Sequence, residues 1–379
     1  MNKVIYYTNA VSQSYFPEYL KKWTVAPNLS NQNFHNKLIR AIAKYVKVDV
    51  ISIRPINRNF SMSGLKPLKE EEKNISWRYP QVSVSRAYKF FFLSSLIKQV
   101  EPKGKEDAVI IVDTLNLSCL KAAKSLAARK GYKVFGVCTD NPYNISYAHK
   151  QYLKRLMNLG TTLDGYIVLT EAINKIYNLY DKPYVLIDGV SEEVETKPNI
   201  YSNEKYIYFG GSLMKQYGVY NLIQAYKELN LEDTLLILCG HHVNTKALHK
   251  EIIENPKIVY LGSVNYLVNL SLEKSALVTI NPRPIDPKID NYSIPSKTLE
   301  SLAVGALNIT VDNKLLKEHY WDSIIWAKSS SVHDLKVALH TALSLSKEEK
   351  EKIINTGKKK VMERTSLEVV GKIIHDLIA

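Results

Sequence analysis

The sequence has few cysteines and no long apolar run. Its cysteines, Cys119, Cys138 and Cys239, are scattered through apolar segments. An odd, unpatterned set argues against a disulfide framework or a cysteine metal site and favours buried, reduced thiols. The apolar stretch KFFFLSSLI, starting at Lys89, is far shorter than the roughly 18 residues that a membrane span needs. The amino terminus lacks an apolar signal core. We therefore expect a cytoplasmic protein.

Acidic residues are also scarce relative to basic ones. The chain has 51 Lys and Arg against 37 Asp and Glu, a formal net charge of +14. Such a balance favours anionic partners: nucleic acid, an acidic membrane surface or phosphorylated ligands. A generally lysine-rich, solvated surface is the alternative, because much of the excess lies in ordinary helical segments such as KKKVMER. With 379 residues and 45% hydrophobic content, the chain is long enough for two folded domains.

Apolar strand-like runs alternate with amphipathic segments along almost the whole chain. Near-continuous apolar strands separated by helices predict parallel sheets that are covered on both faces. Two sets of such strands therefore predict two doubly wound α/β domains. The expected strands are KVIYYTN, KVDVISI, DAVIIVD, YKVFGVC, DGYIVLT and PYVLID in the first set, then KYIYFGG, TLLILCG, KIVYLGS, ALVTINP, ALNITVD and SIIWAKS in the second.

The boundary between the domains is expected in the polar stretch 187–205, where periodicity lapses. We assign residues 1–190 to the first domain and residues 191–379 to the second, with the last helix able to pack back on the first domain. Residues 54–80 form a long polar excursion, and loops of that length are uncommon unless they are functional or disordered.

Ligands of doubly wound domains bind beyond the carboxyl ends of the strands. In the second domain, KYIYFGG is followed by SLMKQYG, so Gly210 and Gly211 let the backbone approach a ligand and Lys215 comes next. A glycine-rich turn before a helix offers free amides and a positive dipole end to phosphate. The stretch is not a G-x-G-x-x-G fingerprint, and a purely structural turn is the alternative.

A second strand exit, NPRPIDPKIDNYSIPSKTLESLAVG, carries a more specific pattern. Pro295 is expected at the first helical position, where its missing N–H costs nothing. The amides of Ser296 and Lys297 are then free donors of the first turn, and the Arg283 and Lys297 cations add to the same pocket. The alternative is an ordinary capped helix.

Glu300 lies three to four residues beyond this helix start and so shares its face. A carboxylate beside a phosphate site repels the anion, but it suits a neutral diol further along the ligand. A nucleoside diphosphate fits this pattern, with its phosphates at the helix start and its ribose hydroxyls on Glu300.

The pairing of GGSLMKQYG with NPRP…YSIPSKTLESLAVG resembles the donor-binding domain of GT-B glycosyltransferases, in particular the retaining family-4 group of bacterial surface polysaccharide synthesis. The resemblance covers residues 205–312 and extends more loosely to the first domain and the IDGV linker. It implies two Rossmann-like domains facing a central cleft. It also implies that Glu300 holds the donor ribose, that Lys215 neutralises the diphosphate, and that the Pro-Ser-Lys helix start lies under the phosphates.

Two positions depart from the pattern of that family. Many members carry a glutamate where this chain has Tyr292, and a histidine near the donor sugar where it has Thr139 with Asp140 beside it. Both departures concern the transferred sugar and leave the nucleotide expectation unchanged. We take Asp140, Lys215 and Arg283 as the candidate catalytic residues.

No bound metal or separate cofactor is expected. No D-x-D stands in a strand-exit loop, and no pair of carboxylates is placed as in glycosidases. The adjacent His241 and His242 follow the strand TLLILCG and could ligate a metal, but a polar loop explains them as well. In retaining enzymes of this fold the leaving phosphate is thought to deprotonate the acceptor.

The first domain is expected to take the acceptor. The loop 25–37 offers Asn31, Gln32 and Asn33, whose amides suit sugar hydroxyls. The stretch 85–105 mixes aromatic residues with basic ones, including Arg86, Lys89 and Lys105. It could lie on an anionic membrane and meet a lipid-linked acceptor, or form a core helix that leads into DAVIIVD.

Together with these observations, the resemblance implies a hexosyltransferase that moves sugar from a nucleotide-sugar donor, with UDP as the expected nucleotide, to a glycan or lipid-linked saccharide in capsule or exopolysaccharide synthesis. The enzyme is expected to retain the anomeric configuration and to be cytoplasmic or peripheral on the inner face of the plasma membrane. The alternatives are a GT-B nucleotide-sugar epimerase and a basic nucleic-acid-binding protein. The epimerase needs an acidic and histidine set that is not evident, and the basic residues are too dispersed for a nucleic-acid platform.

Overall fold

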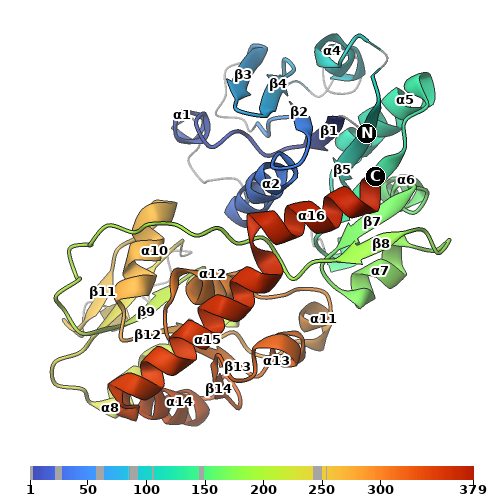
Figure 1. Ribbon diagram of the computed structural model, residues 1–379. Coiled ribbons are helices and arrows are strands. Elements are labelled where there is room, and N and C mark those ends of the chain that lie inside the picture. The colour runs from blue at the N-terminus through green and yellow to red at the C-terminus, as the bar shows by residue number, and fades with distance from the viewer. Residues whose placement is uncertain are drawn as a thin grey trace. The chain divides into compact units, whose positions relative to one another are not determined.

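The protein folds into two compact units, seen in a computed structural model (Figure 1). The first unit is Met1–Val190 with Thr365–Ala379, and the second is Ser191–Arg364. The last fifteen residues, which we counted with the second domain while allowing the last helix to pack back on the first, belong to the first unit. The structure describes the whole chain apart from residues 1, 2, 22–27, 57–63, 84, 86–92, 105, 145–148, 242–249 and 253.

Within the described residues, the first unit is built on an eight-stranded sheet of order β3-β4-β2-β1-β5-β6-β7-β8. All pairs of neighbouring strands are parallel except β3 with β4. The strands expected from the apolar runs of the first half are all present. The strands are β1 (Lys3–Thr8), β2 (Lys47–Ser52), β3 (Leu68–Glu72), β4 (Ile75–Tyr79), β5 (Ala108–Asp113), β6 (Val134–Cys138), β7 (Gly165–Val168) and β8 (Tyr184–Leu186).

The polar excursion 54–80 contains a β-hairpin that extends this sheet. Strands β3 and β4 pair in antiparallel fashion, and β4 continues the sheet by pairing in parallel with β2. The sequence of β3, LKEEE, has its side chains half-buried or exposed, whereas Trp77 and Tyr79 of β4 are buried. Because β3 is an edge strand with little apolar surface, its sequence resembles a solvated loop, and the interpretation of residues 54–80 as one long loop was wrong.

Helix α16 closes the first unit from the far end of the chain. It packs on α2 and β8, as its red ribbon beside the blue α2 shows in Figure 1. At the crossing, a Cβ built on Gly371 would lie 2.2 Å from the carbonyl oxygen of Ala41, so only glycine allows this approach. The helices of the unit are α1 (Phe16–Leu20), α2 (Leu29–Ile42), α4 (Leu93–Val100), α5 (Leu117–Lys130), α6 (Lys150–Gly160), α7 (Glu171–Tyr177) and α16 (Leu367–Ile378).

The second unit is built on a six-stranded parallel sheet of order β11-β10-β9-β12-β13-β14, again within the described residues. All the strands expected in this half are present. They are β9 (Tyr206–Gly210), β10 (Leu235–Cys239), β11 (Ile258–Tyr260), β12 (Val278–Asn281), β13 (Asn308–Val311) and β14 (Ile325–Ala327). The helices are α8 (Val219–Leu229), α10 (Tyr266–Ser275), α11 (Pro287–Asp290), α12 (Ser296–Val304), α13 (Lys314–Tyr320), α14 (Val332–Ser344) and α15 (Lys347–Thr365).

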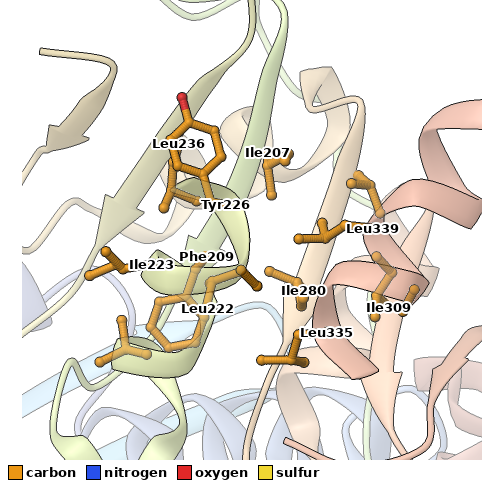
Figure 2. Packing of buried hydrophobic residues seen from close by; sticks show 14 of the residues in the cluster. Ile207, Phe209, Leu222, Ile223, Tyr226, Leu236, Ile280, Ile309, Leu335 and Leu339 are labelled. Carbon is orange, nitrogen blue, oxygen red and sulfur yellow. The ribbon is translucent and has the colours of Figure 1, made fainter. Parts of the chain in front are cut away.

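The two faces of this second sheet carry different cores. Alternate residues of β9 point to opposite faces, so Ile207 and Phe209 join a large apolar cluster with α8 and α14 (Figure 2). Tyr206 and Tyr208 point to the other face, where α10 and α12 lie. The cluster in Figure 2 is purely aliphatic and aromatic, whereas the α10 and α12 side contains buried polar groups. The sheet therefore has one apolar face and one partly polar face.

Two expectations from composition can be compared directly with the structure. Cys119, Cys138 and Cys239 are all buried and unbonded, as expected of structural thiols. Among the described residues, no helix combines the length and apolarity that crossing a membrane requires.

The crossing of α16 and α2 makes a stability prediction. Alanine is the better helix former by about 1 kcal/mol, yet Gly371→Ala should destabilise the protein because its methyl group would overlap Ala41. Overpacking of this kind costs about 1–3 kcal/mol, and denaturant unfolding measures it. Gly104→Ala, which meets only the flexible Glu106 side chain at 3.9 Å, is the control. Equal stability of the two variants would contradict the close approach.

Candidate functional site

The exit of strand β9 is shaped by two adjacent glycines. The Gly211 amide donates to the Cys239 carbonyl at 2.8 Å, which joins the exits of β9 and β10. A Cβ on Gly210 would lie 2.7 Å from Oδ1 of Asn269, and a Cβ on Gly211 would lie 3.2 Å from Cε of Lys297. The glycines thus make room for side chains of α10 and α12. One of those side chains is the Lys297 cation that the sequence placed in the same pocket.

The turn after this exit carries Lys215. Residues Lys215–Tyr217 form a 3-10 turn that ends at Gly218, whose φ of 79° is left-handed. A Cβ on Gly218 would lie 2.0 Å from the carbonyl oxygen of Pro282, so the turn packs directly on the exit of β12. The Lys215 side chain is exposed and makes no ion pair with the described residues. It is therefore an available cation on a rigid turn.

Arg283, in contrast, already has a carboxylate partner. Its guanidinium donates to Asp290, at the end of the short helix α11. Asp290 also accepts from the Asp286 amide at 2.7 Å. The pair closes the loop between β12 and α12, so Arg283 has a structural role that the sequence analysis did not anticipate. Because Asp290 compensates part of its charge, Arg283 is a weaker candidate phosphate ligand than an unpaired cation would be.

Helix α12 begins one residue later than expected. Pro295 is the N-cap, with φ −63° and ψ 96°, and Ser296 is the first helical residue, so the placement of Pro295 inside the helix was wrong. The Thr298 amide donates to the Pro295 carbonyl at 3.1 Å. The amides of Ser296 and Lys297 have no acceptor in the described part of the chain. The side chains of both residues are exposed, so this end of α12 is open to an anion.

Glu300 follows one turn along α12 and is half-buried. Beneath it lies a second carboxyl group, that of Glu273 on α10, which is 3% exposed. Glu273 accepts from Nδ2 of Asn269 at 2.8 Å and from Oγ of Ser301 at 3.2 Å. Burial, with the nearby Glu300, raises the pKa of Glu273 to about 7, although the Lys297 cation acts in the opposite direction. Two carboxyl groups and one cation therefore interact at this helix start.

A small cavity lies beside two of these groups, Glu273 and Lys297. It lies on the α10 and α12 side of the sheet, and Glu273 and Lys297 are both in its wall. The other residues that line it are Tyr208, Phe209, Gly210, Thr279, Ile280, Asn281, Ser301 and Asn308.

The candidate residues of the first unit lie in two places. Asp140 follows β6, is half-buried, and accepts from the Asn141 amide at 2.7 Å. Asn31, Gln32 and Asn33 are not in a loop, as expected, but in the first turns of α2, which begins at Leu29.

The three amides of α2 differ in availability. Gln32 is buried and bonds both ways to Val11, accepting from its amide at 2.9 Å and donating to its carbonyl at 2.6 Å. Its side chain therefore supports the fold, and the expectation that it offers itself to an acceptor was wrong. Asn31 and Asn33 are half-buried and remain candidates.

Some expectations fall outside what the structure describes. His242, Arg86, Lys89, Phe90 and Lys105 belong to the residues that are not described, and with them most of the aromatic-basic stretch before α4.

Sequence reasoning missed Glu273 and Asn281. Glu273 lies in NLSLEKSAL, where it resembles an ordinary solvent-facing helical glutamate. One sign was present: Glu273 is three residues after Leu270, so helical periodicity places it on a buried face. Asn281 ends β12 and donates to Oγ1 of Thr298 at 3.3 Å, which ties the strand exit to α12. Nothing in the sequence distinguishes that asparagine from a turn residue.

Comparison with known proteins agrees with this architecture. Residues 190–360 match the family model of the Glycosyl transferases group 1. No curated protein sequence matches the chain. Among solved structures, a sucrose-phosphate synthase from Thermosynechococcus elongatus has a TM-score of 0.72 at 12% identity, with 100% of this chain and 98% of that chain covered.

Two further structures were solved with nucleotide ligands. One is described as trehalose-6-phosphate from E. coli bound with UDP-2-fluoro glucose, with a TM-score of 0.70 at 12% identity over 100% of this chain and 99% of that chain. The other is HepE of Anabaena in complex with UDP and glucose, with a TM-score of 0.64 at 11% identity over 98% of each chain. At these identities the likeness concerns the fold. The chain thus has the GT-B fold, with two Rossmann-like parallel-sheet domains, and residues 190–360 match the model of the Glycosyl transferases group 1.

Proposed function

We propose that the protein is a hexosyltransferase that takes its sugar from a nucleotide-sugar donor, with UDP as the nucleotide. The observation that carries the proposal is the convergence of Lys215, Lys297 and the open α12 amides on packed strand exits of a Glycosyl transferases group 1 domain. The structural neighbours that hold UDP or a UDP-sugar support the choice of nucleotide. The nucleotide sugar is the substrate, and the proposal includes no separate cofactor or metal.

The proposed chemistry follows from where positive charge lies in the second unit. Departure of a nucleoside diphosphate develops negative charge on its phosphate oxygens, and fixed cations and amides stabilise that charge most in the transition state. Lys215 and Lys297 supply the cations, and the Ser296 and Lys297 amides supply oriented dipoles. Arg283 contributes less, because Asp290 shares its charge.

The acceptor side of the proposal rests on the first unit. Asp140, at the exit of β6, is proposed to contact the transferred sugar, and Asn31 and Asn33 to bind acceptor hydroxyls. Transfer is proposed to proceed with retention, the leaving phosphate taking the proton of the attacking hydroxyl. The acceptor is proposed to be a growing cell-surface polysaccharide, in keeping with the resemblance of the donor-site motifs to enzymes of that synthesis.

The basic surface of the first unit supports an additional proposal of membrane docking. Helices α5 and α6 pack together, and neither contains an aspartate or glutamate. Lys121, Lys150, Lys154 and Arg155 on them are exposed. A cation near an anionic bilayer contributes about 1 kcal/mol, so the four exposed cations of this helix pair suffice for reversible docking. We propose that this helix pair holds the enzyme on anionic lipid, where a lipid-linked acceptor is found.

We also propose that Glu300 binds the ribose hydroxyls of the donor, and this contact predicts a loss of nucleotide affinity when the side chain is removed. Glu300→Ala should weaken binding of UDP and of uridine alike by about 1.5–3 kcal/mol, the scale of hydrogen bonds to a charged group. Calorimetry measures both ligands. Glu348→Ala removes an exposed glutamate from α15 of the same unit and should leave both affinities unchanged. Unchanged affinity in a folded Glu300→Ala protein would exclude the ribose contact.

If Lys215 and Arg283 bind the diphosphate, their removal should lower the affinity for UDP and not the affinity for uridine. Lys215→Ala should weaken UDP but leave uridine unaffected, because uridine has no phosphate. Arg283→Gln should weaken UDP by a smaller factor, since Asp290 already compensates part of its charge. Lys352→Ala, on the exposed face of α15, is the matched control. Equal losses for UDP and uridine in Lys215→Ala would place the phosphate contact elsewhere.

The docking proposal is tested by co-sedimentation with vesicles. The protein should pellet with phosphatidylserine-containing vesicles at low salt, dissociate at high salt as the charges are screened, and ignore neutral vesicles. The double change Lys154→Glu and Arg155→Glu should reduce partitioning by at least about 30-fold, from about 1 kcal/mol per lost cation. The change Lys352→Glu with Lys359→Glu alters net charge equally on α15 of the second unit. If both double variants lose binding to the same extent, only total charge matters and the α5–α6 face is not the docking surface.

A further inference from the structure

Glu273 is a buried carboxyl group that the donor-binding proposal does not use. It lies on α10, which packs against β9 and α12 in the second unit (Figure 1). Its side chain is 3% exposed and is held by Asn269 on its own helix and Ser301 on α12. Tyr208 extends the same chain of bonds, because its hydroxyl donates to Oδ1 of Asn269 at 2.7 Å. Glu273 is therefore fixed between the sheet and the helix whose start is open to an anion.

Among the described residues, the charged and titratable groups that face Glu273 come from three other elements. From α12 these are Lys297 and Glu300, which act on it with opposite sign. From β9 and β10 they are Tyr208 and Cys239, and burial raises the pKa of both above their ordinary values, so both stay neutral near pH 7. The partners on α10 and the remaining polar residues of the cavity wall are uncharged. Within the described part of the chain, burial first, and then the charges of Glu300 and Lys297, therefore set the protonation state of Glu273.

Lys297 connects this buried group to the donor site. Its side chain passes over Gly211, with Cε 3.2 Å from the position of a Cβ there, and it lines the same cavity as Glu273. It makes no ion pair with the described residues. The same ammonium group can therefore be drawn toward an ionised Glu273 or toward a diphosphate at the start of α12, and these two anions compete for it.

We propose that Glu273 is a positioning residue that links proton binding to donor binding, its neutral form leaving Lys297 to the diphosphate and its ionised form drawing Lys297 away. This inference rests on the proposed function, since it takes the diphosphate to bind at the start of α12. It adds a residue and a pH dependence that the donor proposal does not contain.

Proton binding by Glu273 and nucleotide binding are thermodynamically linked, and this linkage determines whether the affinity rises or falls with pH. A diphosphate beside Lys297 and Glu300 adds negative charge near Glu273, which disfavours its ionised form and raises its pKa further. Because the free enzyme has Glu273 titrating near pH 7, binding takes up a proton around neutral pH. Reciprocity then requires the affinity to rise as pH falls. Wild-type protein should bind the nucleotide several-fold more tightly at pH 6.5 than at pH 8.5.

Calorimetric titration with UDP, ADP and GDP between pH 6.5 and 8.5 tests the inference in the full-length protein. Glu273→Gln keeps the shape of the neutral form, since its amide can accept from Asn269 and donate to Ser301. It should bind as tightly as the wild type at pH 6.5 and keep that affinity at pH 8.5. The nucleotide's own phosphate ionisation, with a pKa of about 6, affects both proteins equally and cancels in the comparison.

A second variant separates this role from a merely structural one. Ser301→Ala removes a hydrogen bond that favours the charged form of Glu273. It should move the midpoint of the pH profile to higher pH and leave the size of the change intact. Uridine, which lacks phosphates, should bind without pH dependence in all three proteins. A merely structural Glu273 would lower affinity in both variants without moving any midpoint.

Thermal unfolding gives a readout that does not need the ligand. A carboxyl whose pKa is raised on folding binds more protons in the folded than in the unfolded state between pH 4.5 and about 7, so stability falls as pH rises through that range. Glu273→Gln should lack that fall and have a higher melting temperature than the wild type at pH 8. A lower melting temperature of Glu273→Gln at pH 8 would overturn the premise that burial disfavours the ionised carboxylate.

The outcomes separate the two proposals. If none of the nucleotides binds to any of the proteins, the donor-binding function is wrong. If a nucleotide binds and the wild type and Glu273→Gln have the same pH profile, the donor site stands and the coupling through Glu273 is overturned. A pH dependence that Glu273→Gln abolishes and Ser301→Ala displaces supports the coupling.

Discussion

The candidate donor site depends on how closely the strand exits of the second unit approach one another. Gly218, at the end of the Lys215 turn, leaves only 2.0 Å between a Cβ position and the Pro282 carbonyl oxygen. Gly240 likewise allows the exit of β10 to approach the exit of β9, because a Cβ at Gly240 would lie 1.8 Å from the carbonyl oxygen of Gly211. Both residues have positive φ, so a side chain at either would be strained as well as crowded. These two contacts hold the loops from β9, β10 and β12 against one another.

A chain of buried hydrogen bonds then fixes α12 on this platform. Oγ1 of Thr298 contacts Oγ1 of Thr310 at 2.9 Å, and Thr310 donates to Asn308 at 2.7 Å. Asn308 donates in turn to Oγ1 of Thr279 at 2.8 Å. Such a network has directional partners at every step, so it sets the position of the helix more narrowly than apolar packing would. The open amides of α12 are therefore held in place before any ligand arrives.

Much of the fold could be predicted from the sequence, because apolar strand runs and helical periodicity are local. All the strands expected from those runs form in both units. The hairpin strand β3 escaped prediction because its LKEEE sequence buries little. The return of the last helix to the first unit was allowed for, but its partners α2 and β8 were not identified, because they lie far away in the sequence. The glycine turn and the open helix start were likewise visible in local sequence. The side-chain contacts could not be predicted in this way, because they form only in the tertiary structure. They are the ion pair of Arg283 with Asp290 and the hydrogen bonds of Gln32 with Val11 and of Glu273 with Ser301.

The missed partnerships change the expected electrostatics more than the expected fold. Two unit charges about 4 Å apart interact by about 4 kcal/mol at the effective dielectric typical of protein sites, so every added carboxylate near a phosphate site matters. Asp290 removes part of the charge that Arg283 was expected to contribute, and Glu273 and Glu300 add negative charge beside Lys297. A site built only for phosphate would have no use for two carboxyl groups. Glu300 is explained if it faces ribose, a neutral diol. Glu273 faces no such group, and its burial makes its charge conditional on pH. The net charge of Lys297, Glu273 and Glu300 at the start of α12 is therefore close to zero, and it changes by one unit when Glu273 gains or loses a proton. The charge of a purely basic phosphate pocket would not change in this way.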